Sequence, residues 1–169
     1  SASRAQKQAC LVMPRRSLSN RLIASPNHQR TDEYEVRIIT MKIKTFIFNP
    51  LQENTYLVID QASNECMIID AGMLFDQEKQ QIAAYLQDNN LQLKYVVNTH
   101  LHLDHCFGND FLYKKYGIKA KADKKDESNL NMLKSYAQVF GIPYNGDVQG
   151  LDSYLNDGDE ITFGDTTLK

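Results

Sequence analysis

The chain has 169 residues, of which 42% are hydrophobic and 24% are charged, and this composition is typical of one globular domain. Its net charge of −2 gives no electrostatic basis for binding nucleic acid, and the sequence contains no apolar run of about 18 residues that would predict a membrane span. The three cysteines, Cys10, Cys66 and Cys106, are odd in number and widely spaced, so no disulfide framework is predicted. This cysteine usage favours a reducing compartment, and we expect a cytoplasmic protein.

The first 40 residues differ in composition from the rest of the chain. Residues 1–31 contain six arginine or lysine residues and no acidic residue. One interpretation is a disordered extension or a translated leader that is not native, with Met41 as the natural start. The alternative is an organellar transit peptide, because such peptides are rich in arginine and serine and poor in acidic residues. In that case the protein would be organellar.

Regular patterns begin at Met41. Alternating apolar residues or short apolar runs predict strands at residues 42–48, 54–60, 66–70 and 93–98. Before the last of these strands, Asp76 can cap a helix that ends at Asn89-Asn90. The expected apolar face of this helix consists of Ile82, Ala83 and Leu86.

The second half of the chain predicts two more helices and a hairpin. One helix follows His105 and ends at Gly117, and another spans about residues 124–140. The apolar spacing of the latter predicts that Leu130, Leu133, Ala137 and Phe140 belong to the core. After a loop at 144–159, two short strands at 161–163 and 166–168 flank a turn at Gly164-Asp165. Together these elements predict a mixed α/β fold with a sheet at least partly covered by helices.

Three of the four histidines lie within six residues, directly after the strand predicted at 93–98. His100 and His102 are two residues apart, so in an extended segment their side chains point to the same side and can bind one metal ion. Asp104 and His105 follow, where they can face a second ion, as in two-metal sites with ions roughly 3.5–4 Å apart. This cluster stands at the end of an apolar strand, where α/β proteins commonly place their sites. We therefore favour a metal centre that generates a hydroxide for attack on an ester, thioester or amide.

The sequence THLHLDH resembles the signature of the metallo-β-lactamase superfamily. The segments NPLQENTYLVID, IIDAG, NTHLHLDHCFGN and LNDGDEITFGDTTLK extend this resemblance over residues 41–169, and they are similar to the hydroxyacylglutathione hydrolase (glyoxalase II)-like branch. The resemblance implies an αββα sandwich in which His100 and His102 bind one metal ion, and Asp104 and His105 a second. It implies two zinc ions, with iron or manganese as alternatives, and hydrolysis of a glutathione thioester by a metal-bound hydroxide. Asp104 would also accept the proton.

Residues near the histidines resemble family positions that support the site. The family keeps an aspartate at Asp70, where it would orient the histidine loop, and a role in the turn alone is the alternative. Thr99 either forms a hydrogen bond within the same loop or completes the strand. For Asn54 and Thr55 we favour a structural role. Cys106 is expected to be a small buried residue, although it follows a predicted ligand.

In the family, a distal histidine in a PGH-type motif, a bridging aspartate and a last histidine complete the metal site. No histidine follows His105 here, so we expect residues 41–169 to be the N-terminal part of the domain of a longer enzyme. The 169-residue polypeptide alone is expected to have little or no hydrolase activity. The expected partner is a small-molecule thioester or ester. Alternatives are another enzyme of the superfamily, such as a lactonase or persulfide dioxygenase, and an inactive metal-binding fragment.

Overall fold

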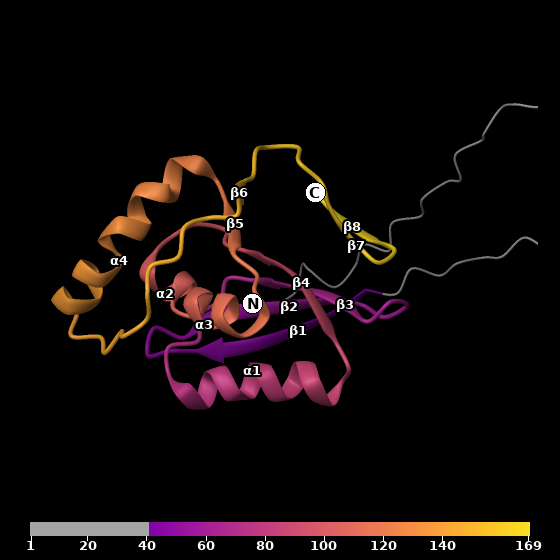
Figure 1. Cartoon of the computed structure of the whole chain (residues 1–169), viewed down its shortest axis with the longest axis horizontal. Helices are drawn as coiled ribbons and strands as arrows, with labels where there is room; N and C mark the ends of the chain where they lie inside the picture. Colours follow the sequence, from indigo (N-terminus) through magenta and orange to yellow (C-terminus); the bar gives the residue numbers. More distant parts are fainter. Residues whose placement is uncertain (1–40) are drawn as a thin grey trace, which may run out of the picture. The chain divides into compact units, whose positions relative to one another are not determined.

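A computed structural model describes residues 41–169, so the predictions for residues 1–40 lie outside the described part of the chain. One mixed sheet with the strand order β1-β2-β3-β4-β5-β6 forms its centre (Figure 1). The strands are β1 (Met41–Phe48), β2 (Glu53–Asp60), β3 (Glu65–Ile69), β4 (Gln92–Val97), β5 (Ala120–Ala122) and β6 (Ser153–Tyr154). The first three strands pair antiparallel, and β3 to β6 pair in parallel. The four strands predicted between residues 42 and 98 are confirmed, whereas β5 was not predicted and β6 lies where a loop was expected.

One face of the sheet packs against two helices, α1 (Asp76–Asp88) and α3 (Asn109–Tyr116), and forms the larger core. Buried members of this core are Phe46, Leu57, Ile68 and Val96 from the strands and Ile82, Leu86 and Leu112 from the helices. The core residues of each strand are spaced two apart in the sequence, so the pleat of the strand directs their side chains to one face of the sheet. Burial of this apolar surface stabilises the part of the fold that carries the histidine loop.

The opposite face of the sheet is covered in part by a short hairpin of β7 (Ile161–Phe163) and β8 (Thr166–Leu168). Phe163 packs there with Val58 and Met67 in a separate apolar cluster. Farther along the same face, the side chains of Ile43 and Ile47 are 47% and 67% exposed. The mixed α/β class is confirmed, with helices on one face of the main sheet and the β7–β8 pair on the other.

The start of α1 differs from the prediction. Phe75 is the N-cap residue and Asp76 is the first residue of the helix. The carboxylate of Glu78 accepts hydrogen bonds from the backbone N–H groups of Leu74 and Phe75, at 2.8 and 2.9 Å. A glutamate at the third helical position therefore satisfies the helix start in place of the expected aspartate cap. The end at Asn89, the C-cap residue, is as predicted.

The helix predicted after His105 is divided into two. A single turn, α2 (Leu103–Cys106), is separated from α3 at Gly108, whose N–H donates to the carbonyl of Ala71 at 2.7 Å. A Cβ on Gly108 would lie 2.7 Å from the Cε atom of Met73 and 3.0 Å from the carbonyl oxygen of Ala71, so this close approach favours glycine. The predicted end at Gly117 is confirmed, since this residue has a φ of 73°.

The last long helix is preceded by one 3-10 turn, η1 (Lys124–Asp126), and α4 itself spans Glu127–Val139. Its residues Leu130, Leu133 and Ala137 are buried, as predicted. Phe140 is 67% exposed, so its assignment to the core was wrong. It follows the last helical residue, where the helical spacing used for the prediction no longer applies. Within residues 41–169, no helix is long and apolar enough to cross a membrane.

Candidate metal centre

The predicted ligands lie on a short loop and the helical turn that follows it. Strand β4 ends at Val97, and the loop from there reaches α2, for which His102 is the N-cap residue. Asn98 fixes this loop at both ends, because its backbone N–H donates to Lys121 and its side-chain amide donates to the carbonyl of His105 at 2.7 Å. The loop is therefore anchored to the neighbouring strand and to the helical turn.

The structure brings all four predicted ligands together. The ring centroid of His100 lies 4.6 Å from that of His102 and 4.0 Å from that of His105. The Nε2 atom of His105 lies 3.5 Å from the Oδ2 atom of Asp104. His102 is exposed and the other three are half-buried, so the cluster opens toward solvent at one side.

Asp70 lies behind this cluster and holds the loop. Its carboxylate accepts hydrogen bonds from the N–H and the hydroxyl of Thr99, at 2.8 and 2.7 Å. The Thr99 oxygen lies 3.0 Å from Nδ1 of His100. Because the hydroxyl proton goes to Asp70, the oxygen accepts from Nδ1–H, and Nε2 of His100 retains the lone pair that a metal needs. Asp70 and Thr99 thus form the contacts expected of residues that orient the histidine loop.

Glu53 also faces this region and was missed in the sequence analysis. Its Oε1 atom lies 3.8 Å from Nδ1 of His105, and Oδ2 of Asp70 lies 3.2 Å from the same nitrogen. Glu53, Asp70 and His105 each offer one ligand atom within 4.8 Å of the others, so this group could also hold a metal ion. The alternation of side chains along β2 could have identified Glu53, because it places this acidic residue on the same face of the strand as the buried Thr55 and Leu57.

The electrostatics of the cluster are dominated by buried carboxylates. Burial, together with the charges of Asp70 and Asp104, raises the pKa of Glu53 to about 8 against the opposing hydrogen bond from Thr55. Burial lowers the pKa of His100, and the neighbouring His105 and His102 add to this effect. A histidine with a lowered pKa stays neutral, which is the form that binds metal.

The residues present fit a divalent cation. Imidazoles and carboxylates are the preferred ligands of zinc and iron, and this cluster supplies both. Among the residues from 41 onward, Oε1 of Glu53 is buried without a hydrogen-bond partner, and Nδ1 of His105 has the carboxylates of Asp70 and Glu53 as its neighbours. Buried polar atoms are normally paired, so the unpaired Oε1 of Glu53 fits a site that is completed by a positive ion or another bound group.

The remaining residues singled out in the sequence have structural positions. Thr55 is buried, donates to Glu53 at 2.8 Å and accepts from the N–H of Gly72 at 3.0 Å, whereas Asn54 is exposed. Cys106 is buried in a second core with Leu130, and burial raises the pKa of its thiol well above the usual range. A thiol in this state is a poor metal ligand, in agreement with its predicted packing role.

A sequence profile of the metallo-β-lactamase superfamily matches residues 48–169. The chain belongs to this superfamily. One relative, the hydroxyacylglutathione hydrolase of Pelagibacter ubique, is 39% identical over 85 residues, which cover 50% of this chain and 34% of that protein. The hydroxyacylglutathione hydrolase GloC of Haemophilus influenzae is 29% identical over 118 residues, covering 69% of this chain and 50% of that protein. The chain therefore spans half or less of the length of these two relatives.

Solved structures with the same architecture support the fold. The BLEG-1 B3 metallo-β-lactamase matches with a TM-score of 0.62 and 23% identity, covering 75% of this chain and 58% of its own. TTHA1623 in a di-iron-bound form matches with a TM-score of 0.59 and 22% identity, covering 70% of this chain and 56% of its own. At these identities the matches establish the shared fold, and the predicted metallo-β-lactamase type is confirmed.

Proposed function

We propose that this chain forms part of a metal-dependent hydrolase that acts on a glutathione thioester or a related thioester. The observation that carries the proposal is the convergence of His100, His102, Asp104 and His105 in one cluster, with Asp70 holding the loop behind them. The thioester class is supported by the relatives named hydroxyacylglutathione hydrolase.

The proposed centre holds two ions. His100 and His102 would bind one ion, and Asp104 and His105 would bind the other. Zinc is the expected metal, with manganese and iron as alternatives, and a structural neighbour in a di-iron-bound form makes iron the first alternative to test. When bound, such ions lower the pKa of water and polarise a carbonyl oxygen, which is the chemistry that thioester hydrolysis needs.

The chain's own residues contribute orientation and proton transfer. Asp70 orients the Thr99 hydroxyl, whose oxygen accepts a hydrogen bond from Nδ1–H of His100, so that Nε2 of this ring is free to face the metal site. Asp104, half-buried and 3.5 Å from His105, is the residue we assign to accept the proton released during hydrolysis. Four clustered donors are few for two ions, so we expect weak or no turnover by residues 1–169 alone.

The test is hydrolysis of a hydroxyacylglutathione by the protein isolated from its source. Its intact mass is compared with the 19.4 kDa of this chain in the same experiment. We expect release of glutathione that stops on chelation and returns with zinc or iron. A metal-loaded protein that cleaves no thioester, yet opens lactones or oxidises persulfides in parallel assays, would contradict the proposal.

Two histidine variants give a matched control for this assay. His102→Asn removes a predicted ligand and is expected to abolish chelator-sensitive hydrolysis. His28→Asn changes the one histidine outside the cluster and is expected to leave hydrolysis unchanged. Equal losses in both variants would show that the cluster has no special role.

A further inference from the structure

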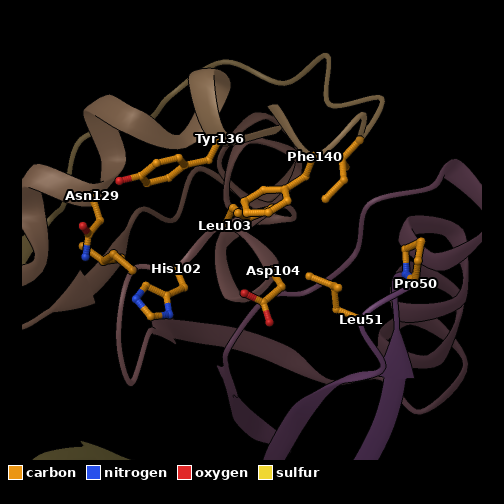
Figure 2. Close-up of a pocket in the computed structure, with 10 residues that line it drawn as sticks. Pro50, Leu51, His102, Leu103, Asp104, Asn129, Tyr136 and Phe140 are labelled. Carbon is orange, nitrogen blue, oxygen red and sulfur yellow. The ribbon is translucent and has the colours of Figure 1, made fainter. Parts of the chain in front are cut away.

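A groove with a volume of about 640 Å³ lies beside the predicted metal ligands (Figure 2). His102 and Asp104 line one part of it, so a group bound at the metal centre can extend into it. In Figure 2, the ring of Tyr136 from α4 lies on the side of Asn129 and His102, and the ring of Phe140, which follows α4, lies between Tyr136 and Leu51. The groove is therefore continuous with the candidate metal centre and has walls from two separate parts of the chain.

The walls of the groove are mainly apolar. The apolar side chains that line it belong to Pro50, Leu51, Leu101, Leu103, Phe140 and Ile142. Two of these are strongly exposed, Leu51 at 56% and Phe140 at 67%, and Tyr136 is 42% exposed. Exposed apolar residues that gather in one concave place mark a binding surface, since covering them removes apolar area from water.

The charge of the groove also limits what it can bind. Among the described residues that line it, there is no lysine or arginine. Carboxylates of a peptide-like arm, such as those of glutathione, need such cations for charge-assisted hydrogen bonds. The groove is thus suited to an uncharged apolar group.

We propose that this groove binds an apolar arm, an alkyl or aryl group joined to the carbonyl that the metal centre hydrolyses. The proposal rests on the proposed function, because the metal centre fixes the carbonyl at His102 and Asp104. The arm then lies between Leu51 and Phe140. The substrate class is thereby an acyl compound with a medium-length or aromatic apolar arm, and short acyl compounds bind more weakly.

The test is binding of a series of alkanoates to the zinc-loaded 169-residue chain, measured by isothermal titration calorimetry. Acetate, butanoate, hexanoate and octanoate share the carboxylate and differ in the apolar arm. Each methylene group fully removed from water strengthens binding about fourfold, and an open groove is expected to give at least about twofold. Octanoate should therefore bind at least about tenfold more tightly than butanoate. Equal dissociation constants along the series would overturn the proposal.

Two neighbouring substitutions locate the effect. Phe140→Ser removes a groove wall, and its exposure means that the fold does not depend on it. Val139→Ser is the matched control, because Val139 is 78% exposed and does not line the groove. We expect Phe140→Ser to weaken octanoate binding several-fold and leave acetate binding unchanged, and Val139→Ser to change neither. Equal effects of both substitutions on octanoate binding would place the arm elsewhere and overturn the proposal.

Binding and turnover separate this proposal from the proposed function. Chain-length-dependent binding by the 169-residue chain, together with no thioester cleavage by the metal-loaded protein isolated from its source, would retain the groove and refute the hydrolase. Thioester hydrolysis with the same KM for acetyl and octanoyl substrates would retain the hydrolase and refute the groove.

Discussion

Replacing Asp70 by asparagine is expected to weaken metal binding by the histidine loop while the fold is retained. Asp70 has a φ of 57°, and asparagine adopts this left-handed region readily, so the backbone tolerates the change. The substitution removes the negative charge that accepts two hydrogen bonds from Thr99. The histidine loop then loses its charge-assisted hydrogen bonds to the residue that follows β3.

The magnitude follows from these contacts. A hydrogen bond to a charged group contributes about 1.5–3 kcal/mol and a neutral one about 0.5–1.5 kcal/mol, so two weakened bonds cost about 2 kcal/mol. Thr99 is exposed, so water replaces part of these hydrogen bonds and offsets part of that loss. We expect the free energy of unfolding to fall by about 1 kcal/mol. Residues that orient metal ligands typically change metal affinity by about 10–100-fold, and a loss in this range is expected.

Zinc affinity is measured by competition with a chromophoric chelator, and the free energy of unfolding by urea denaturation. Asp60→Asn is the matched control, because Asp60 is also buried and hydrogen-bonded but lies at the opposite end of β2 from Glu53. It accepts from Ser63 and Thr166 instead of the histidine loop. Asp60→Asn should lower stability and leave zinc affinity unchanged. Unchanged affinity in Asp70→Asn, or equal losses in both variants, would refute the role of Asp70.

Three further predictions concern the scaffold. Burial alone would raise the pKa of Asp60, but hydrogen bonds from Thr166 and Ser63 lower the pKa below the value of 3.8 in the unfolded chain. The Asp60 carboxylate therefore stabilises the fold fully above pH 3.8, and this contribution is lost as the pH falls through the lower pKa of the folded chain. Urea denaturation between about pH 6 and about pH 2 should show a larger loss of stability in the parent chain than in Asp60→Asn, because Asp110, which also has a lowered pKa, remains in both. Gly164→Ala should lower the free energy of unfolding by about 2 kcal/mol or more in the same assay, because Gly164 has a φ of 54° and a Cβ would collide with Ser63. Burial raises the pKa of Cys66 to about 12, so its peptide should remain unalkylated by iodoacetamide, as read by mass spectrometry, until the chain unfolds.

The histidine cluster could be predicted because its geometry is local. His100 and His102 are separated by one residue in an extended segment, and Asp104 and His105 follow in the first helical turn. Glu53 could not be placed in the same way. It reaches the site only through the antiparallel pairing of β2 with β3, in which Tyr56 lies opposite Ile69, so that the start of β2 lies beside Asp70.

The errors in the helices also have physical causes. The helix after His105 is interrupted because Gly108 binds the carbonyl of Ala71, a tertiary contact that periodicity does not record. Phe140 continues the apolar spacing of α4 but follows its end, so it projects into the groove beside the candidate site. In this chain, the position that departs from the core pattern is one to which we assign a binding role.

The most direct test of the metal centre is the metal content of the 169-residue chain after zinc loading and gel filtration, measured by inductively coupled plasma mass spectrometry. The parent chain and His28→Asn are expected to retain zinc in equal amounts. His100→Asn and His102→Asn are expected to lose most of it. Retention of the full zinc content by both cluster variants would contradict the assignment of this loop as the metal centre.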